Sequence, residues 1–192
     1  AYNASIFHLT THAFFKALLF LSAGSVIHAM HHEQDMRKMG GLFKKIPFTA
    51  TMMWIGSLAI IGFPYLSGYY SKESILENAF YASNGIAYFA YLVGILTALL
   101  TAFYSWRLLF LTFHGENRSN NKTYDHAHES PLVMTAPLFI LAIGSIFSGI
   151  FFADYFIGYY KKEFWDNAIL LTESSHKSVS YTHLRAHETD SH

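Results

Sequence analysis

Two histidines and a lysine follow one another at intervals of four residues near the start of the chain. They are His8, His12 and Lys16, in the run FHLTTHAFFKALLFL. A residue four places further along a helix lies one turn on and about 40° around it, so the three side chains share one slowly drifting face. Histidine changes charge near neutral pH, and a lysine removed from water can also exchange its proton. The spacing therefore predicts a relay of protonatable groups.

Two other interpretations of these residues stay open. Lys16 could extend its side chain to a membrane surface, with the histidines as hydrogen-bonded interior groups. However, Lys16 is followed by the apolar run 17–21 and lies deep within its apolar segment. His8 and His12 could also ligate a metal ion, but no carboxylate or third ligand accompanies them. We therefore expect proton exchange, with no metal or cofactor held by this chain.

A second candidate is Lys72, in the run GFPYLSGYYSKES. Pro64 removes a backbone donor and Gly68 loosens the chain, so we expect a helix to break here and restart near Ser71 or Ser74. Lys72 would then lie at the start of the second half-helix, where the electropositive end disfavours a charged ammonium. Broken helices at membrane depth line cavities, and transporters use their ends to handle ions. The alternative is that Pro64 ends a span and Lys72 lies in an exposed loop.

The composition shows which solvent these elements meet. Of the 192 residues, 52% are hydrophobic and only 14% are charged, whereas soluble domains average roughly 25% charged. The formal net charge is zero, so no basic field exists to hold a nucleic acid. The absence of cysteine excludes disulfides, thiolate metal sites and cysteine nucleophiles. Because the chain does not begin with Met, we expect a truncated start without a signal peptide.

Four apolar blocks reach the roughly 20 residues that a membrane-spanning helix needs. One such block can be buried in a large soluble protein, but four in succession would leave too little polar surface. We expect an all-α fold, a polytopic transmembrane helical bundle with one discontinuous helix. The expected spans are 6–30, 47–80 (broken near 64–71), 86–113 and 131–158. The transmembrane fragment would cover 1–160, followed by a polar segment at 161–177 and a non-native tail at 178–192.

The distribution of Lys and Arg predicts the orientation of the bundle. The loops after the first and third blocks carry the basic residues Arg37, Lys38, Lys44, Lys45, Arg118 and Lys122. The turn at 82–85 carries none. By the positive-inside rule, those two loops share one side and face the cytoplasm or matrix.

Long ordered strings in the chain resemble one family. FHLTTHAFFKALLFLSAGSVIH, HHEQDMRKMGGL, SKESIL and YSWRLLFLTFHG are similar to strings of the antiporter-like L subunit (ND5 type) of respiratory complex I, NADH-quinone oxidoreductase. The resemblance covers roughly residues 1–155 and fades beyond Lys162. The THAFFKALLF core is shared with subunits of sodium/proton antiporters.

The resemblance implies more than the residue pattern does. In that family each inverted repeat has a broken helix and a buried lysine, and the subunit holds no redox centre. His8, His12 and Lys16 match the family's relay positions, and Lys72 matches the lysine at the outlet-side break. The family's earlier repeat and long lateral helix have no counterpart in this chain.

The expected function is accordingly proton translocation coupled to quinone reduction elsewhere in a complex. NADH, FMN, iron–sulfur clusters and quinone (ubiquinone) would bind partner subunits. The expected partners are other membrane-arm subunits and the lipid bilayer of a bacterial or mitochondrial inner membrane. Two alternatives remain: a subunit of a multi-subunit cation/proton antiporter, and a structural membrane subunit that transports nothing.

Overall fold

The computed structural model describes residues 2–82, 84–166 and 168. Every regular element in these ranges is a helix, in the order α1 (Tyr2–Ala29), η1 (Met36–Lys38), η2 (Leu42–Lys44), α2 (Pro47–Ile61), α3 (Ser67–Tyr81), α4 (Gly85–Phe113), α5 (Asn121–His126), α6 (Leu132–Phe156) and α7 (Lys161–Trp165). The expected all-α membrane bundle is confirmed. The expected non-native tail at 178–192 lies outside the described residues, as does most of the segment 161–177.

Three helices of the described residues are long and apolar enough to cross a membrane by themselves, namely α1, α4 and α6. α2 is apolar but has only 15 residues. At 1.5 Å per residue it spans about 22 Å, which is short of a hydrocarbon core about 30 Å thick. Together α2 and α3 form the discontinuous helix, separated by residues 62–66.

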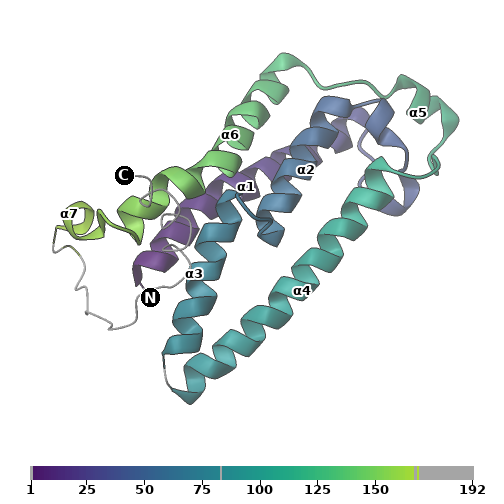
Figure 1. Cartoon of the computed structure of the whole chain (residues 1–192). Helices are drawn as coiled ribbons and strands as arrows, with labels where there is room; N and C mark the ends of the chain where they lie inside the picture. The colour runs from purple at the N-terminus through teal and green to yellow at the C-terminus, as the bar shows by residue number, and fades with distance from the viewer. Residues whose placement is uncertain (1, 83, 167, 169–192) are drawn as a thin grey trace, which may run out of the picture.

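α1 is the central helix of the bundle. It packs against α2, α3 and α6, while α4 packs along the outer side of α2 and α3. In Figure 1, α4 follows α3 and runs back past it toward α5. α1 therefore provides the surface on which the other inner helices pack.

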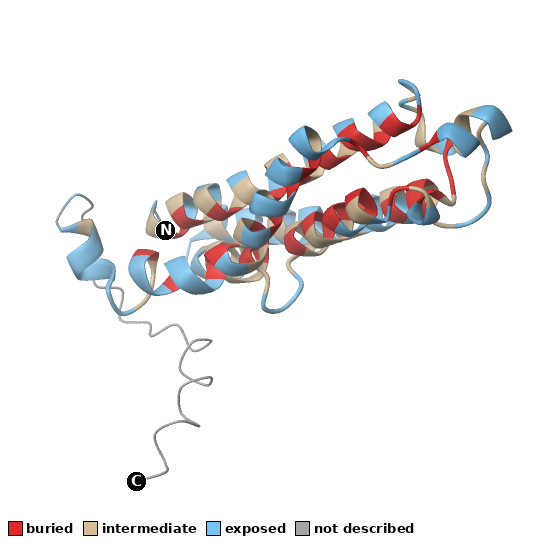
Figure 2. Cartoon of the chain, turned by 90° about the horizontal axis from the view of Figure 1, so that it is seen from above, coloured by how far each residue is buried: buried red, intermediate tan, exposed pale blue. Residues whose placement is uncertain are grey.

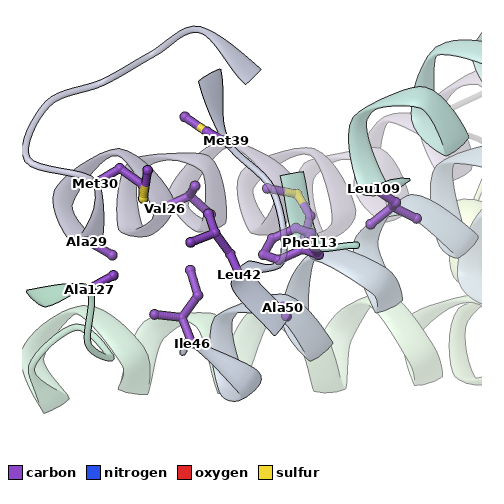
Figure 3. Close-up of a cluster of buried hydrophobic side chains, with 11 residues drawn as sticks. Val26, Ala29, Met30, Met39, Leu42, Ile46, Ala50, Leu109, Phe113 and Ala127 are labelled. Carbon is purple, nitrogen blue, oxygen red and sulfur yellow. The ribbon is translucent and has the colours of Figure 1, made fainter. Parts of the chain in front are cut away.

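A buried cluster joins the helix ends on the side of the two basic loops (Figure 3). It consists of apolar residues from α1, α2, α4 and the loops between them: Val26, Ala29, Met30, Met39, Leu42, Ile46, Ala50, Met53, Leu109, Phe113 and Ala127. Because both loops contribute to this one cluster, they lie at the same end of the bundle, as their charges predicted.

Charged side chains of these loops are paired with one another. Arg37 forms a salt bridge of 2.9 Å with Asp35. Its side-chain hydrogen bonds lower the pKa of Asp35 to about 2, so this carboxylate stays ionised through the physiological range. Between the loops, Lys45 lies 3.8 Å from Asp125, and Arg118 Nε donates to the Arg37 carbonyl oxygen at 3.1 Å. These contacts hold the two loops together.

Buried residues concentrate where helices face one another (Figure 2). α4 is the exception, because its buried residues all lie in its last third. Its remaining surface exposes large apolar side chains, including Phe89, Leu96 and Phe103 at 56–69% exposure. This apolar outer surface is suited to lipid or to further helices rather than to water.

Candidate functional site

The three basic residues of α1 lie in successive turns but in different surroundings. The rings of His8 and His12 are half-buried, and their centroids are 5.6 Å apart. Phe15 packs edge-on against the His12 ring at 5.1 Å. Lys16 is exposed on the surface of the chain, near the middle of a 28-residue helix. At 1.5 Å per residue it is about 20 Å from either helix end, which is beyond the reach of a lysine side chain.

Ser71 of α3 fixes the orientation of the first histidine. His8 Nδ1 lies 3.0 Å from Ser71 Oγ, and the Thr11 hydroxyl donates to the same oxygen at 2.8 Å. Ser71 in turn donates to the Ser67 carbonyl oxygen at 3.2 Å. In this arrangement Ser71 accepts from both Thr11 and a His8 Nδ1–H, which leaves the other ring nitrogen free to accept a proton. Ser71 was not among the predicted site residues, although its place directly before Lys72 was an available signal.

The break between α2 and α3 is earlier and sharper than predicted. α2 ends at Gly62, which has a left-handed conformation at φ +89°, and Tyr65 also has a positive φ of +70°. These two residues complete the change of direction, so α3 already begins at Ser67. The predicted restart near Ser71 or Ser74 is wrong, because both residues lie inside α3.

Gly68 does not loosen the chain, contrary to the prediction. It is buried in the first turn of α3, where a Cβ would lie 1.9 Å from the Ala59 carbonyl oxygen. Only glycine allows α3 to approach the end of α2 this closely. The contact brings the second turn of α3 over the last carbonyl groups of α2.

Lys72 lies in that second turn and reaches back to the end of α2. Its Nζ donates to the carbonyl oxygens of Ile60, at 3.4 Å, and Ile61. The prediction placed it at the electropositive start of a half-helix, and the alternative placed it in an exposed loop. Both are wrong: Lys72 is half-buried, and its ammonium meets the carbonyl end of α2, whose partial negative charge stabilises a cation.

These groups follow one another across two elements. His8, His12 and Lys16 lie one turn apart on α1, and His8 contacts Ser71 of α3, the residue before Lys72. The order in space is therefore Lys16, His12, His8 and Lys72. The structure brings together all four residues that the sequence singled out, with the histidines between the lysines.

A cavity of about 210 Å³ opens beside Lys16, between α1, α2 and α4. Its lining is mostly apolar but includes Ser57, Tyr104 and Ser105. Since a water molecule takes about 30 Å³, the cavity has room for several. In the described part of the chain, no three His, Cys, Asp or Glu residues gather in a way that could hold a metal ion. The chemistry that this arrangement offers is proton exchange between fixed side chains and water.

Apolar helices packed with a discontinuous helix, with His8, His12 and Lys72 half-buried among them, are typical of an antiporter-like integral membrane protein. Residues 1–101 match the family described as "NADH:quinone oxidoreductase/Mrp antiporter, TM". Residues 104–162 match the family "NADH dehydrogenase subunit 5 C-terminus". The chain belongs to this family, in the ND5-type branch of complex I membrane subunits.

Individual relatives agree with this assignment. The chain is 56% identical over 168 residues to NADH-quinone oxidoreductase subunit L of Rhodobacter capsulatus, which covers 82% of this chain and 23% of that protein. It is 49% identical over 178 residues to NADH-ubiquinone oxidoreductase chain 5 of Phytophthora infestans, covering 93% and 27%. The same chain of Marchantia polymorpha is 51% identical over 170 residues, covering 88% and 25%.

The chain thus spans about a quarter of the length of the curated relatives it matches. The family and the apolar helices make it an integral inner-membrane protein.

Proposed function

We propose that this chain forms a proton-translocating part of a membrane-arm subunit of an NADH-quinone oxidoreductase. Lys16, His12, His8 and Lys72 relay protons in this order between the cavity and the broken helix. Quinone reduction, with its NADH, FMN and iron–sulfur clusters, takes place in partner subunits. The observation that carries the proposal is the row of four protonatable side chains that ends at the carbonyl groups of α2.

In this proposal a water molecule carries the proton between the two histidines, whose ring centroids are 5.6 Å apart. Direct transfer would need their ring nitrogens within about 2.6–3.2 Å of each other. The cavity beside Lys16 gives that lysine access to water.

Lys72 has the role of a gate in this proposal. Its charged form donates hydrogen bonds to the Ile60 and Ile61 carbonyl oxygens. Its neutral form has one N–H donor fewer and no positive charge, so it binds these oxygens more weakly. A change in the electric field from the rest of the complex would shift the balance between the two forms. Each pKa unit of that balance corresponds to about 1.4 kcal/mol.

Substitution of Lys72 in the full-length subunit tests this role. We expect Lys72→Ala to abolish NADH-driven proton pumping and to lower the coupled rate of quinone reduction. Lys72→Arg keeps the positive charge and the donors to the α2 carbonyls but cannot lose its proton. If proton exchange is essential, the arginine variant also fails to pump; if Lys72 only ties α3 to α2, arginine restores pumping.

The measurement uses the assembled complex in sealed membrane vesicles, with quinone reduction and internal acidification followed together. Lys161→Ala is the control, because Lys161 is an exposed lysine of α7. Normal protons per electron in both Lys72 variants would refute the proposal.

A second candidate is a subunit of a multi-subunit cation/proton antiporter, because the family description that matches residues 1–101 names both groups. Such a protein would exchange sodium or potassium for protons without any NADH oxidation. Cation-driven pH changes in vesicles that lack NADH would favour it. A structural subunit that transports nothing would tolerate neutral replacement of all four relay residues.

A further inference from the structure

The N-terminus of α2 is capped by a residue from a distant loop. The N-cap position is Ile46, whose side chain makes no capping hydrogen bond, and Pro47 follows it. The next two N–H groups donate instead to the carboxylate of Glu129, from Phe48 at 3.0 Å and from Thr49 at 3.3 Å. The Thr49 hydroxyl donates to the same carboxylate. Glu129 thus satisfies backbone donors that α2 leaves unpaired.

Three buried hydroxyl groups extend this contact to two other helices. Thr49 lies 2.9 Å from Ser25 of α1, and Ser25 lies 2.6 Å from Ser130, just before α6. All three are at least nine-tenths buried, with exposures of 0%, 1% and 6%. The Glu129 loop therefore connects the start of α2 to α1 and α6.

Apolar packing positions α2 along one face. This buried face consists of small residues and two flexible methionines: Thr49, Ala50, Met52, Met53, Gly56, Ser57 and Ala59. The methionines adapt their shape readily, whereas the hydrogen bonds to Glu129 have a defined geometry. The cap at Glu129 is the polar contact that defines the axial position of α2 at this end.

The opposite end of the same helix is where Lys72 binds. The 3.4 Å contact from Lys72 Nζ to the Ile60 carbonyl is already at the limit of a hydrogen bond, so a shift of about 1 Å would break it. α2 therefore carries an anion at its N-terminus and a cation at its C-terminus, which is the arrangement that its dipole favours. The two charged groups are about 20 Å apart along the helix, so their direct electrostatic attraction is weak. Glu129 would instead affect Lys72 through the position of α2.

We propose that Glu129 is a positioning residue of the relay, which holds α2 where its last carbonyl groups bind the Lys72 ammonium. This inference rests on the proposed function of Lys72. It assigns a role in proton translocation to a loop residue that lies at the other end of α2.

Replacement of Glu129 in the full-length subunit within the assembled complex tests the inference. Glu129→Ala removes the cap, and Glu129→Gln keeps one acceptor oxygen without the charge. Glu116→Gln is the control, because Glu116 is an exposed carboxylate in the same connection between α4 and α6. In sealed vesicles we would measure the subunit content, quinone reduction and protons per electron across the pH range in which histidine titrates.

We expect Glu129→Ala to lower the protons per electron, because loss of the cap releases the start of α2. We also expect it to move the pH of half-maximal pumping, with unchanged subunit content. Glu129→Gln should fall between Glu129→Ala and the parent, and Glu116→Gln should match the parent. A purely structural role would lower the subunit content and leave the pH profile in place, which would overturn the inference.

Two further measurements keep the outcome decisive. If the Glu129→Ala subunit does not accumulate in the membrane, the same measurements on Glu129→Gln and Thr49→Val test the inference, because each of these variants removes only part of the cap. Hydrogen exchange of the backbone at 47–54 should rise in these variants. Lys72→Arg, measured in parallel, separates the two proposals. Normal pumping by Lys72→Arg would refute the proton relay. Loss of pumping in Lys72→Arg together with normal pumping in the Glu129 variants would refute only the positioning role of Glu129.

Discussion

Ser71 sets how His8 can act in the proposed relay. An imidazole exchanges a proton through one nitrogen while the other is held in a defined state, and here Ser71 Oγ holds Nδ1 at 3.0 Å. The same oxygen accepts from Thr11 at 2.8 Å, so the serine itself has little freedom to move. A net hydrogen bond of this kind is worth about 1 kcal/mol, which is about fivefold in an equilibrium.

We therefore predict that Ser71→Ala lowers proton pumping about three- to tenfold without loss of the assembled complex. The His8 ring would lose the partner that sets its orientation and tautomer. Ser74→Ala is the control, because Ser74 is a buried serine of the same helix. Proton pumping per electron in sealed vesicles is the measurement, and equal values for the two variants would contradict the role of Ser71.

At the scale of elements, the break between α2 and α3 depends on one glycine. Gly62 has a φ of +89°, and a Cβ there would lie 2.9 Å from both Cε and Nζ of Lys72. The position is therefore restricted twice, by backbone conformation and by the lysine that crosses it.

Gly62→Ala should accordingly displace Lys72 from the α2 carbonyls. We predict that pumping falls at least about tenfold and that thermal stability falls by about 1–2 kcal/mol, the usual cost of this conformation in a residue with a Cβ. Gly24→Ala is the matched control: Gly24 lies inside α1, and nothing is within 4 Å of a Cβ there. Thermal unfolding and proton pumping of both variants are the measurements. Unchanged stability and pumping in Gly62→Ala would contradict the prediction, because the Lys72 side chain could then avoid the added methyl group.

The whole molecule has one basic end and an apolar outer face. The loops around η1, η2 and α5 are joined by a salt bridge, a hydrogen bond and a common apolar cluster. α4 exposes most of its apolar surface, and the chain spans about a quarter of its relatives' length. The outer face of α4 is therefore available to lipid or to further helices.

The common end of these loops predicts the result of labelling in membranes. In a background without other cysteines, Lys44→Cys and Glu116→Cys should react with an impermeant thiol reagent from the same side. Ala82→Cys, at the end of α3, should react only from the other side. By the positive-inside rule the first two should face the cytoplasm or matrix, and reaction of Lys44→Cys and Glu116→Cys from opposite sides would rule out this topology.

The sequence by itself determined the helical membrane fold and the residues of the row. An apolar block of a given length must form a helix in lipid, because no water is present to pair its backbone groups. The four-residue spacing of His8, His12 and Lys16 places them along one helix without any knowledge of neighbours. Lys72 was singled out because it follows Pro64 and Gly68 in an interrupted apolar block.

Only the tertiary structure decided what these residues meet. The restart of α3 at Ser67 was missed because local capping preferences at Ser71 and Ser74 are weaker than the close packing of Gly68 against α2. Lys72 binds the carbonyl end of α2 rather than the start of a half-helix, and Glu129 caps a helix about 80 residues away in the chain. Such contacts depend on where whole helices pack. The packing energy comes from side chains that are far apart in the sequence, so no local stretch of sequence determines it.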